Sequence, residues 1–213
     1  MAFTSPLHGY TAGTANGAGD EIYVTEDGGK TFTLASAKFG TDLLLLDMAA
    51  QGETAIVSGV IGELYTLNNG KSFQPSVGGG VSQNCMPIRG SGGLSYGCVG
   101  TFGFGKIDGA AVTHDGGVTF SAVNASALTT EARYGAFPSK SVWYIAAGDF
   151  PSAPSPPPPA NGAPRRPRKS VFQDHQTGRF SVNRSDTHIT SQTDGYNAQI
   201  VKTEDGGKTY VMW

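Results

Sequence analysis

The chain has 213 residues, which is long enough for one sizeable core and too short for two ordinary domains with a linker, so a single domain over residues 1–213 is expected. The 15 lysines and arginines against 17 aspartates and glutamates leave a net charge of −2, which indicates neither a nucleic-acid-binding surface nor an acidic tail. The longest apolar run, Leu43–Leu46, falls far short of the roughly 20 residues that cross a bilayer, so no membrane span is predicted.

Short β-rich runs separated by glycines begin near the first residue. The run Glu21–Thr25 leads into the turn sequence TEDGGKTF at residues 25–32, and the run TFTLAS follows. Two such runs that flank a glycine-containing loop are typical of a β-hairpin. Together with the runs that begin at Ala2 and near Tyr10, they predict a four-stranded antiparallel unit at about residues 1–36.

The same organisation recurs at about residues 41–78, 82–125 and 131–213, with the turn sequences TLNNGKSF, THDGGVTF and TEDGGKTY. All four turns fit Thr-x-(Asp/Asn)-x-Gly-x-(Thr/Ser)-(Phe/Tyr), and we call them box 1 (25–32), box 2 (66–73), box 3 (113–120) and box 4 (203–210). Four strands in a repeat of roughly 45 residues match the blade of a β-propeller. The predicted fold class is therefore all-β, a β-propeller with four blades in this chain, whether these make a whole or a partial propeller.

The fourth repeat is longer than the others. Boxes 3 and 4 are 90 residues apart at their acidic position, against 41 and 47 residues for the earlier steps. Prolines in the stretch 151–169 lack the N–H groups that a sheet needs, so residues 151–188 are predicted to be a Pro-rich and basic insertion within one blade. A solvated loop is the expected state, with a polyproline ligand or a basic docking arm as alternatives.

Each box residue type has a structural duty. The Asp or Asn accepts N–H bonds across the turn, the glycine supplies a positive φ, the hydroxyl reaches the same loop, and the aromatic ring is expected to be buried between blades. A calcium site is not expected, because each box offers only one or two acidic groups. The predicted structural positions are Thr25, Asp27, Gly29, Thr31, Phe32, Thr66, Asn68, Gly70, Ser72, Phe73, Thr113, Asp115, Gly117, Thr119, Phe120, Thr203, Asp205, Gly207, Thr209 and Tyr210.

These boxes resemble the Asp-box, or BNR repeat, of sialidases, sortilin-type receptors and xyloglucanases. The phrase T-x-D-G-G-K-T-aromatic looks most like the photosystem II assembly and stability factor family. The resemblance implies a non-enzymatic binding or assembly scaffold that presents loops to a protein partner, with no cofactor and no metal. The alternative that it implies is a glycan-binding or glycan-active propeller, sialidase-like or xyloglucanase-like.

The sequence selects no catalytic group for that alternative. A sialidase-like site would need three convergent arginines, yet three of the seven arginines stand at 165, 166 and 168 in the Pro-rich stretch. A xyloglucanase-like site would need two carboxylates roughly 5–10 Å apart across a cleft, and no pair stands out. The four histidines lack the spacing of metal ligands. These absences favour a protein without catalytic activity.

Cys85 and Cys98 are the only cysteines. If Asn84–Gly90 pairs with Gly93–Val99, the two thiols lie opposite each other, where a cross-strand disulfide can form. The sequence leaves a disulfide and two buried free thiols equally open.

The sequence does not fix the compartment. No secretory signal follows Met1, so either the protein is cytosolic or its targeting segment is missing from this chain. The family resemblance favours an extracytoplasmic location, secreted or in an organelle lumen. If the four blades do not close into a ring, exposed sheet edges are expected to promote self-association.

Overall fold

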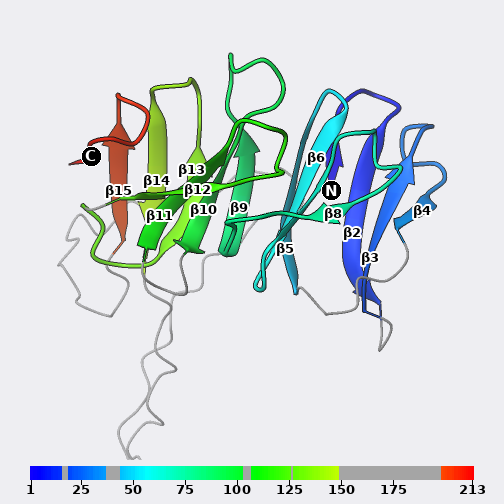
Figure 1. Ribbon diagram of the computed structural model, residues 1–213, viewed down its shortest axis with the longest axis horizontal. Coiled ribbons are helices and arrows are strands. Elements are labelled where there is room, and N and C mark those ends of the chain that lie inside the picture. Colours follow the sequence, from blue (N-terminus) through cyan, green and yellow to red (C-terminus); the bar gives the residue numbers. More distant parts are fainter. Residues whose placement is uncertain (16–18, 37–43, 103–106, 126, 149–197) are drawn as a thin grey trace, which may run out of the picture. The chain divides into compact units, whose positions relative to one another are not determined.

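The computed structural model describes residues 1–15, 19–36, 44–102, 107–125, 127–148 and 198–213 (Figure 1). All regular elements within these ranges are β-strands, which form four antiparallel four-stranded sheets. The predicted all-β propeller built from four-stranded antiparallel blades is thereby confirmed. In the part of the chain that is described, no helix is long and apolar enough to cross a membrane. The predicted insertion at 151–188 lies outside the described residues.

Each blade is a meander in which every strand pairs with its neighbours along the chain. Blade 1 contains β1 (Ala2–Phe3), β2 (Gly9–Ala15), β3 (Gly19–Thr25) and β4 (Thr33–Ser36), and blade 2 contains β5 (Leu45–Gln51), β6 (Thr54–Gly59), β7 (Glu63–Thr66) and β8 (Gln74–Pro75). Blade 3 contains β9 (Val81–Pro87), β10 (Tyr96–Phe102), β11 (Ile107–Thr113) and β12 (Ser121–Asn124), and blade 4 contains β13 (Ala132–Ala136), β14 (Trp143–Ala147), β15 (Gln199–Thr203) and β16 (Val211–Met212).

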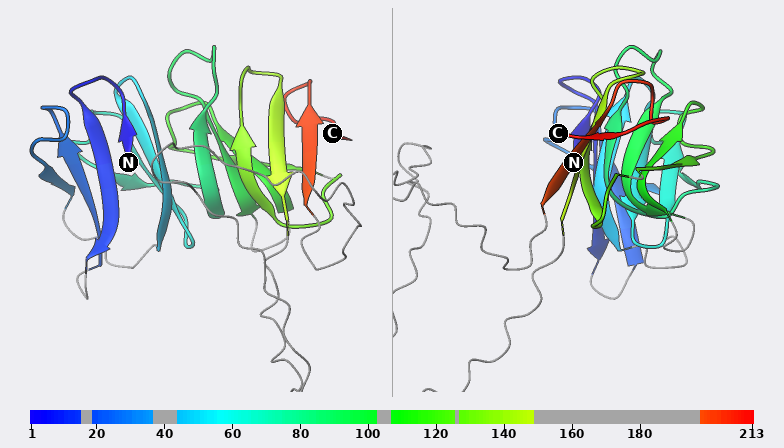
Figure 2. Two further views of the ribbon diagram at one scale, coloured as in Figure 1. Left: turned by 180° about the vertical axis from the view of Figure 1, so that it is seen from behind. Right: turned by 90° about the vertical axis from the view of Figure 1, so that its left-hand side faces the viewer.

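Side chains alternate between the two faces of each blade, as the pleat of a strand requires. We call the face toward the preceding blade the backward face and the face toward the next blade the forward face. On β7, Leu64 packs with blade 1 and so lies on the backward face, whereas Glu63 bonds to Gly80 and Ser82 on the forward side. Neighbouring sheets therefore stack face on face, and the two further views of Figure 2 show the strands of each sheet running alternately up and down.

Three apolar clusters fill the spaces between consecutive blades. The first joins Tyr10 and Ile22 of blade 1 to blade 2, the second joins Ala49 and Ile56 of blade 2 to blade 3, and the third joins blades 3 and 4. Among the residues that these clusters contain, none links blade 1 to blade 4. The core is thus a series of three junctions, and each depends on both of its blades.

Hydrogen bonds between first strands reinforce the stacking. Asp47 of β5 accepts bonds from the Cys85 N–H at 2.8 Å and from Asn84 Nδ2 at 2.9 Å, both on β9. Asn84 Oδ1 in turn accepts a bond from the Gly135 N–H of β13 at 3.0 Å. Charged and amide side chains therefore connect blades 2, 3 and 4 in one line.

A disulfide joins Cys85 and Cys98, which are direct partners in the pairing of β9 with β10. Both residues are buried on the backward face of blade 3, in the cluster that includes Ile56 of blade 2. The bond therefore fixes the two strands of blade 3 that form its junction with blade 2.

Candidate functional site

The boxes close their loops with a repeated set of side-chain bonds. In box 1, Thr25 Oγ1 donates to Asp27 Oδ1 at 2.9 Å and accepts from the Gly29 N–H at 2.8 Å. Asp27 also accepts from the N–H and the hydroxyl of Thr31, at 2.9 and 2.7 Å. The corresponding bonds are present in boxes 3 and 4. Each loop is held by its own residues.

Box 2 closes in the same way with an amide in place of the carboxylate. Asn68 Oδ1 accepts from Thr66 Oγ1 at 2.8 Å and from the Ser72 N–H at 3.1 Å, while Asn68 Nδ2 donates to the Ser72 hydroxyl at 3.0 Å.

In box 1 the hydrogen bonds from Thr31 lower the pKa of Asp27 to about 2. The Asp27 carboxylate is therefore an ionised acceptor of its own loop at neutral pH and poorly suited to donate a proton.

The boxes also contact the preceding blade. A Cβ built on Gly70 would lie 2.7 Å from both Tyr10 and Val24 of blade 1, so box 2 packs backbone against blade 1. The aromatic residue that ends box 2, Phe73, is 4% exposed and meets the Tyr10 ring edge-to-face with 6.2 Å between centroids. Each box from the second onward thus forms part of a blade junction.

The expectation that the aromatic rings of all four boxes are buried is wrong for Phe32 of box 1. It is 39% exposed, because within the described ranges blade 1 has no preceding blade to cover it. Phe120 is buried like Phe73, and Tyr210 is partly buried.

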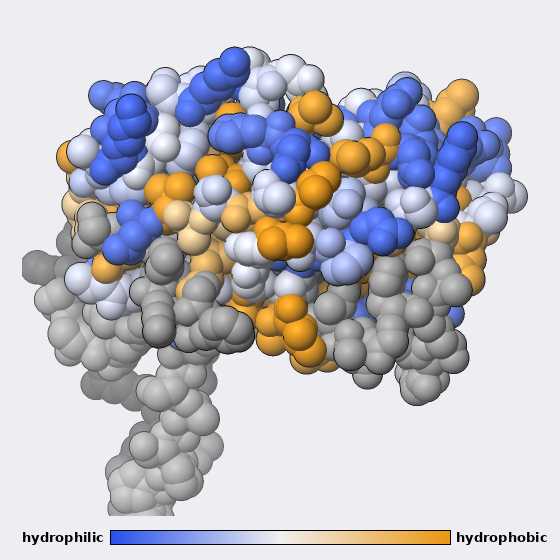
Figure 3. All heavy atoms as spheres, viewed as in Figure 1, coloured by the Kyte–Doolittle hydropathy of each residue, from blue (hydrophilic) through white to orange (hydrophobic). Residues whose placement is uncertain are grey.

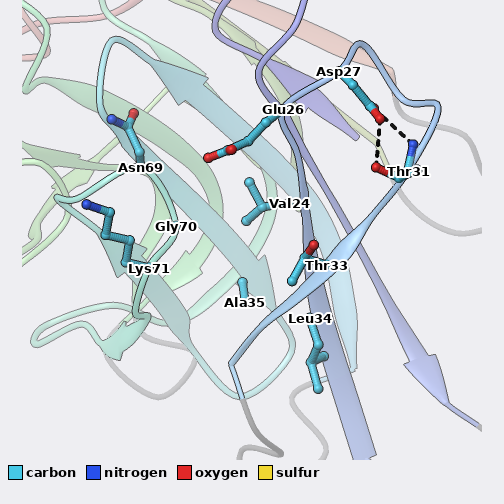
Figure 4. Close-up of a pocket in the computed structure, with 10 residues that line it drawn as sticks. All are labelled: Val24, Glu26, Asp27, Thr31, Thr33, Leu34, Ala35, Asn69, Gly70 and Lys71. Atoms are coloured by element: carbon cyan, nitrogen blue, oxygen red, sulfur yellow. Dashed lines mark hydrogen bonds between the residues drawn. The ribbon is translucent and has the colours of Figure 1, made fainter.

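A groove of about 390 Å³ lies between blade 1 and box 2 (Figure 4). Its walls come from the end of β3 and box 1, from the edge strand β4, and from the tip of box 2. The residues that line it are Val24, Glu26, Asp27, Thr31, Thr33, Leu34, Ala35, Asn69, Gly70 and Lys71.

Both signs of charge border this groove. The Glu26 side chain extends from blade 1 toward the loop of box 2, which carries Asn69 and Lys71 (Figure 4). Asn69 adopts a φ of +56°, a left-handed conformation that asparagine tolerates better than most residues. No ion pair within 4 Å is present between Glu26 and Lys71, so an acid, an amide and an ammonium group are available to a ligand.

The strand β4 gives the groove an unpaired backbone edge. β4 is the last strand in the order of blade 1 and, among the described residues, pairs on one side only, with β3. Thr33, Leu34 and Ala35 of this strand line the groove, and the Leu34 side chain is nearly half exposed. The comparable edge strand of blade 2, β8, is only two residues long and contains Pro75, which has no N–H to offer.

The side chains in the same described ranges bear on catalysis and metal binding. No three His, Cys, Asp or Glu side chains converge there as metal ligands would. The groove contains two carboxylates, Glu26 and Asp27, and Asp27 is already occupied by the hydroxyl and N–H groups of its own loop. The groove is therefore better equipped to hold a ligand than to cleave one.

The box positions predicted from the sequence build the scaffold of this groove, and Asp27, Thr31 and Gly70 also line it. Glu26, Asn69 and Lys71 were missed, because they occupy the variable positions of the pattern. A signal was present: the position after the box threonine carries Glu26, Leu67, His114 and Glu204 in turn, while its neighbours stay nearly constant. Variation within a constant loop marks side chains that the loop does not need for closure.

A separate apolar surface is visible on the face shown in Figure 3. Exposed large apolar residues near the start of β5 and the turn between β6 and β7 are Leu44, Leu46, Val60 and Ile61. This surface offers no titratable or hydrogen-bonding side chain of its own, so the groove remains the better-defined site.

Comparisons with solved structures return β-propellers. A structure described as "YCF48 bound to D1 peptide" aligns with a TM-score of 0.50 and 12% identity over 99% of this chain and 80% of that one. The GH74 enzyme of Niastella koreensis aligns with a TM-score of 0.50 and 16% identity over 99% of this chain and 37% of that one. YCF48 from Cyanidioschyzon merolae gives a TM-score of 0.48 and 15% identity, over 99% and 82% of the respective chains.

At these identities the alignments with a TM-score of 0.50 show a shared fold and nothing about activity. No protein-family model matches the sequence, and no curated protein sequence matches it significantly.

Proposed function

We propose that this protein is a non-enzymatic binding scaffold of the Asp-box type, and that it takes an extended segment of a protein partner into the groove between blade 1 and box 2. The observation that carries the proposal is the unpaired edge of β4 along one wall of that groove. An extended peptide can add to such an edge as a further strand, with main-chain hydrogen bonds for affinity and pockets for alternate side chains.

The side chains of the groove supply the means of selection. Val24 and Ala35 form an apolar wall, and Glu26 and Lys71 place opposite charges near the box loops. A peptide with an apolar residue flanked by a basic and an acidic residue complements this arrangement. The rigid closure of box 1 and box 2 keeps both charges in place before binding, which lowers the entropic cost of association.

The structural comparisons add a precedent for this use of the fold. One of the similar propellers is described as bound to a D1 peptide, so a propeller of comparable architecture accepts a peptide ligand. Another similar structure is a GH74 enzyme, so glycan turnover is the outcome that the experiment must distinguish.

The test is selection of peptides from a displayed random library on the full chain, followed by calorimetric titration of the selected peptides. We expect micromolar binding that is weakened at least about tenfold by Leu34→Asp and by the charge reversal Glu26→Lys. The matched control is Leu7→Asp, because Leu7 is also exposed but does not line the groove.

Two results would contradict the proposal. Selected peptides whose affinity is unchanged by both groove variants would place binding elsewhere. Turnover of a fluorogenic glycoside or of xyloglucan by the purified chain would favour the glycan-active alternative instead.

A further inference from the structure

The three blade junctions are built on equivalent positions, so the two faces outside them can be compared with those inside. The residue three places before the box threonine lies on the forward face. Ile22, Glu63 and Ala110 occupy this position in blades 1, 2 and 3 and are at most 3% exposed. Their counterpart in blade 4, Ile200, is 40% exposed. The forward face of blade 4 is therefore a junction surface that no other described blade covers.

The backward face of blade 1 is uncovered in the complementary way. The residue two places before the box threonine lies on the backward face, where Leu64, Ala111 and Val201 are buried against the preceding blade. In blade 1 this position is Tyr23, which is partly exposed, and Phe32 on the same blade is exposed as well. Each of the two end blades thus presents one half of the same kind of junction.

The glycine at the fifth box position gives independent support. A Cβ built on Gly70 or Gly117 would collide with the preceding blade, at 2.7 Å from Val24 and 2.8 Å from Tyr65 respectively. A Cβ built on Gly29 meets only Phe32 and Phe3 of its own blade, at 3.8 Å or more. Box 1 therefore keeps a glycine where a neighbouring blade would fit, yet no described blade lies there.

The two open faces carry the same charge pattern as the first junction within the chain. Across the first junction, Glu26 follows the threonine of box 1, and Lys71 stands five places after the threonine of box 2. Across the second junction the same two positions are Leu67 and Val118, both apolar, and the third junction departs from this matching with His114 and Lys208. At the open faces the positions are Glu204 on blade 4 and Lys30 on blade 1, which repeats the acid and base of the first junction.

The forward face of blade 4 has the composition of a binding surface. Tyr144 and Trp213 stack edge-to-face with 5.8 Å between ring centroids, beside Val211 and Ile200. Lys202 lies on the same face, with its ammonium group 5.8 Å from the centre of the Tyr144 ring and paired with Glu204, so the face combines aromatic, aliphatic and charged groups. Trp213 is 75% exposed, and tryptophan is enriched at interaction sites.

We propose that this protein assembles head to tail with a second copy of itself, the forward face of blade 4 of one copy packing on the backward face of blade 1 of the other. The chain carries both halves of one junction, and a contact between unlike faces closes into a ring when the rotation per copy allows it. Two copies give eight blades, within the range of four to eight that closed propellers commonly have. The proposal concerns sheet faces, not the sheet edges that the sequence suggested, and it is independent of the groove.

Sedimentation velocity on the full chain, from low to high micromolar concentration, tests the proposal. We expect a species of twice the 22.1 kDa chain mass that dissociates on dilution. Ile200→Lys on blade 4 and Thr11→Glu on blade 1 each bring an unpaired charge into the contact and should weaken association at least about tenfold. Both sites are at least partly exposed, and circular dichroism checks that the variants fold. Ile61→Lys is the matched control, because Ile61 lies in an exposed turn away from both faces.

Mixing the two variants separates head-to-tail contact from other dimers. Each variant keeps one intact face, so an equimolar mixture should recover association between the intact faces. Persistent monomer at every concentration overturns the proposal and leaves the faces to a different chain. A dimer that is lost in only one of the two variants also overturns the proposal. Such a dimer would be symmetric, with the same face of both copies in contact.

Discussion

Gly70 of box 2 lies directly against Val24 of β3, so closely that a Cβ at Gly70 would stand 2.7 Å from the Val24 methyl group. The glycine that gives the loop its positive φ thus also lets two blades approach each other. A turn residue and a packing residue are here the same residue, and substitutions can separate the two duties.

Gly70→Ala should destabilise the protein by about 2–4 kcal/mol, since it adds a steric collision with blade 1 to the cost of a positive φ. Gly29→Ala is the matched control, because Gly29 has a similar φ and no preceding blade against it, and should cost only about 1 kcal/mol. Urea unfolding of both variants measures the difference. Equal losses would contradict a packing duty for Gly70.

The pKa of Asp27 is lowered to about 2 by hydrogen bonds from Thr31. A lowered folded-state pKa contributes stability that is present above the ordinary value of 3.8 and is lost as the pH falls through about 2. Asp27→Asn should therefore fold, because Asn68 closes box 2 in the same way, and should lose less stability than the wild type between pH 4 and pH 2. Thermal unfolding across that range measures it, and parallel curves would contradict the expectation.

Glu63 should give the opposite dependence on pH. It is buried, accepts bonds from the Gly80 N–H and the Ser82 hydroxyl of the next blade, and has a pKa raised by burial. A raised folded-state pKa contributes stability that is complete below the unfolded value and is lost as the pH rises through the folded value. Glu63→Gln should therefore gain stability relative to the wild type as the pH rises from 4.5, the ordinary value.

Chemical unfolding at a series of pH values between acid and pH 8 would show this gain as diverging curves. The exposed Glu53, changed to Gln, serves as the control for the loss of one surface carboxylate. A gain that is the same at every pH would show that Glu63 acts through packing alone.

Removal of the disulfide should weaken the second junction. The double variant Cys85→Ala and Cys98→Ala is expected to lose about 2–4 kcal/mol, as is typical for a bridge in a small β domain. The wild type unfolded under reducing conditions should lose a similar amount, whereas reductant should not change the variant further. An unchanged stability in both cases would contradict a structural duty for the bond.

The sequence predicted the strands that precede the boxes well, and it failed where the answer depended on a neighbouring blade. The run Glu21–Thr25 lies within β3, because local alternation and the box after it determine a strand. Glu63 gives no sign of burial in the sequence, since its partners come from the loop that enters blade 3. Phe32 and Phe73 have the same local sequence context, and only the presence of a preceding blade decides which of them is covered.

The groove could not be predicted for a related reason. Glu26 and Lys71 are distant in the sequence and become neighbours of one groove only through the stacking of blades 1 and 2. A single sequence carries the periodicity of the repeats but not the register between adjacent repeats. The chemistry of a site that lies between repeats is therefore hidden until the repeats are stacked.

The pairing of β14 with β15 has a consequence for how the chain folds. Ala147 at the end of β14 pairs with Gln199 at the start of β15, so two residues 52 positions apart in the sequence are direct partners in the sheet. Bringing together the ends of a chain segment roughly ten times longer than a hairpin turn costs only about 2 kcal/mol more in conformational entropy, because this cost grows with the logarithm of the segment length. Blade 4 should consequently form after the local hairpins of the first three blades, since its second and third strands must meet across a long stretch of sequence.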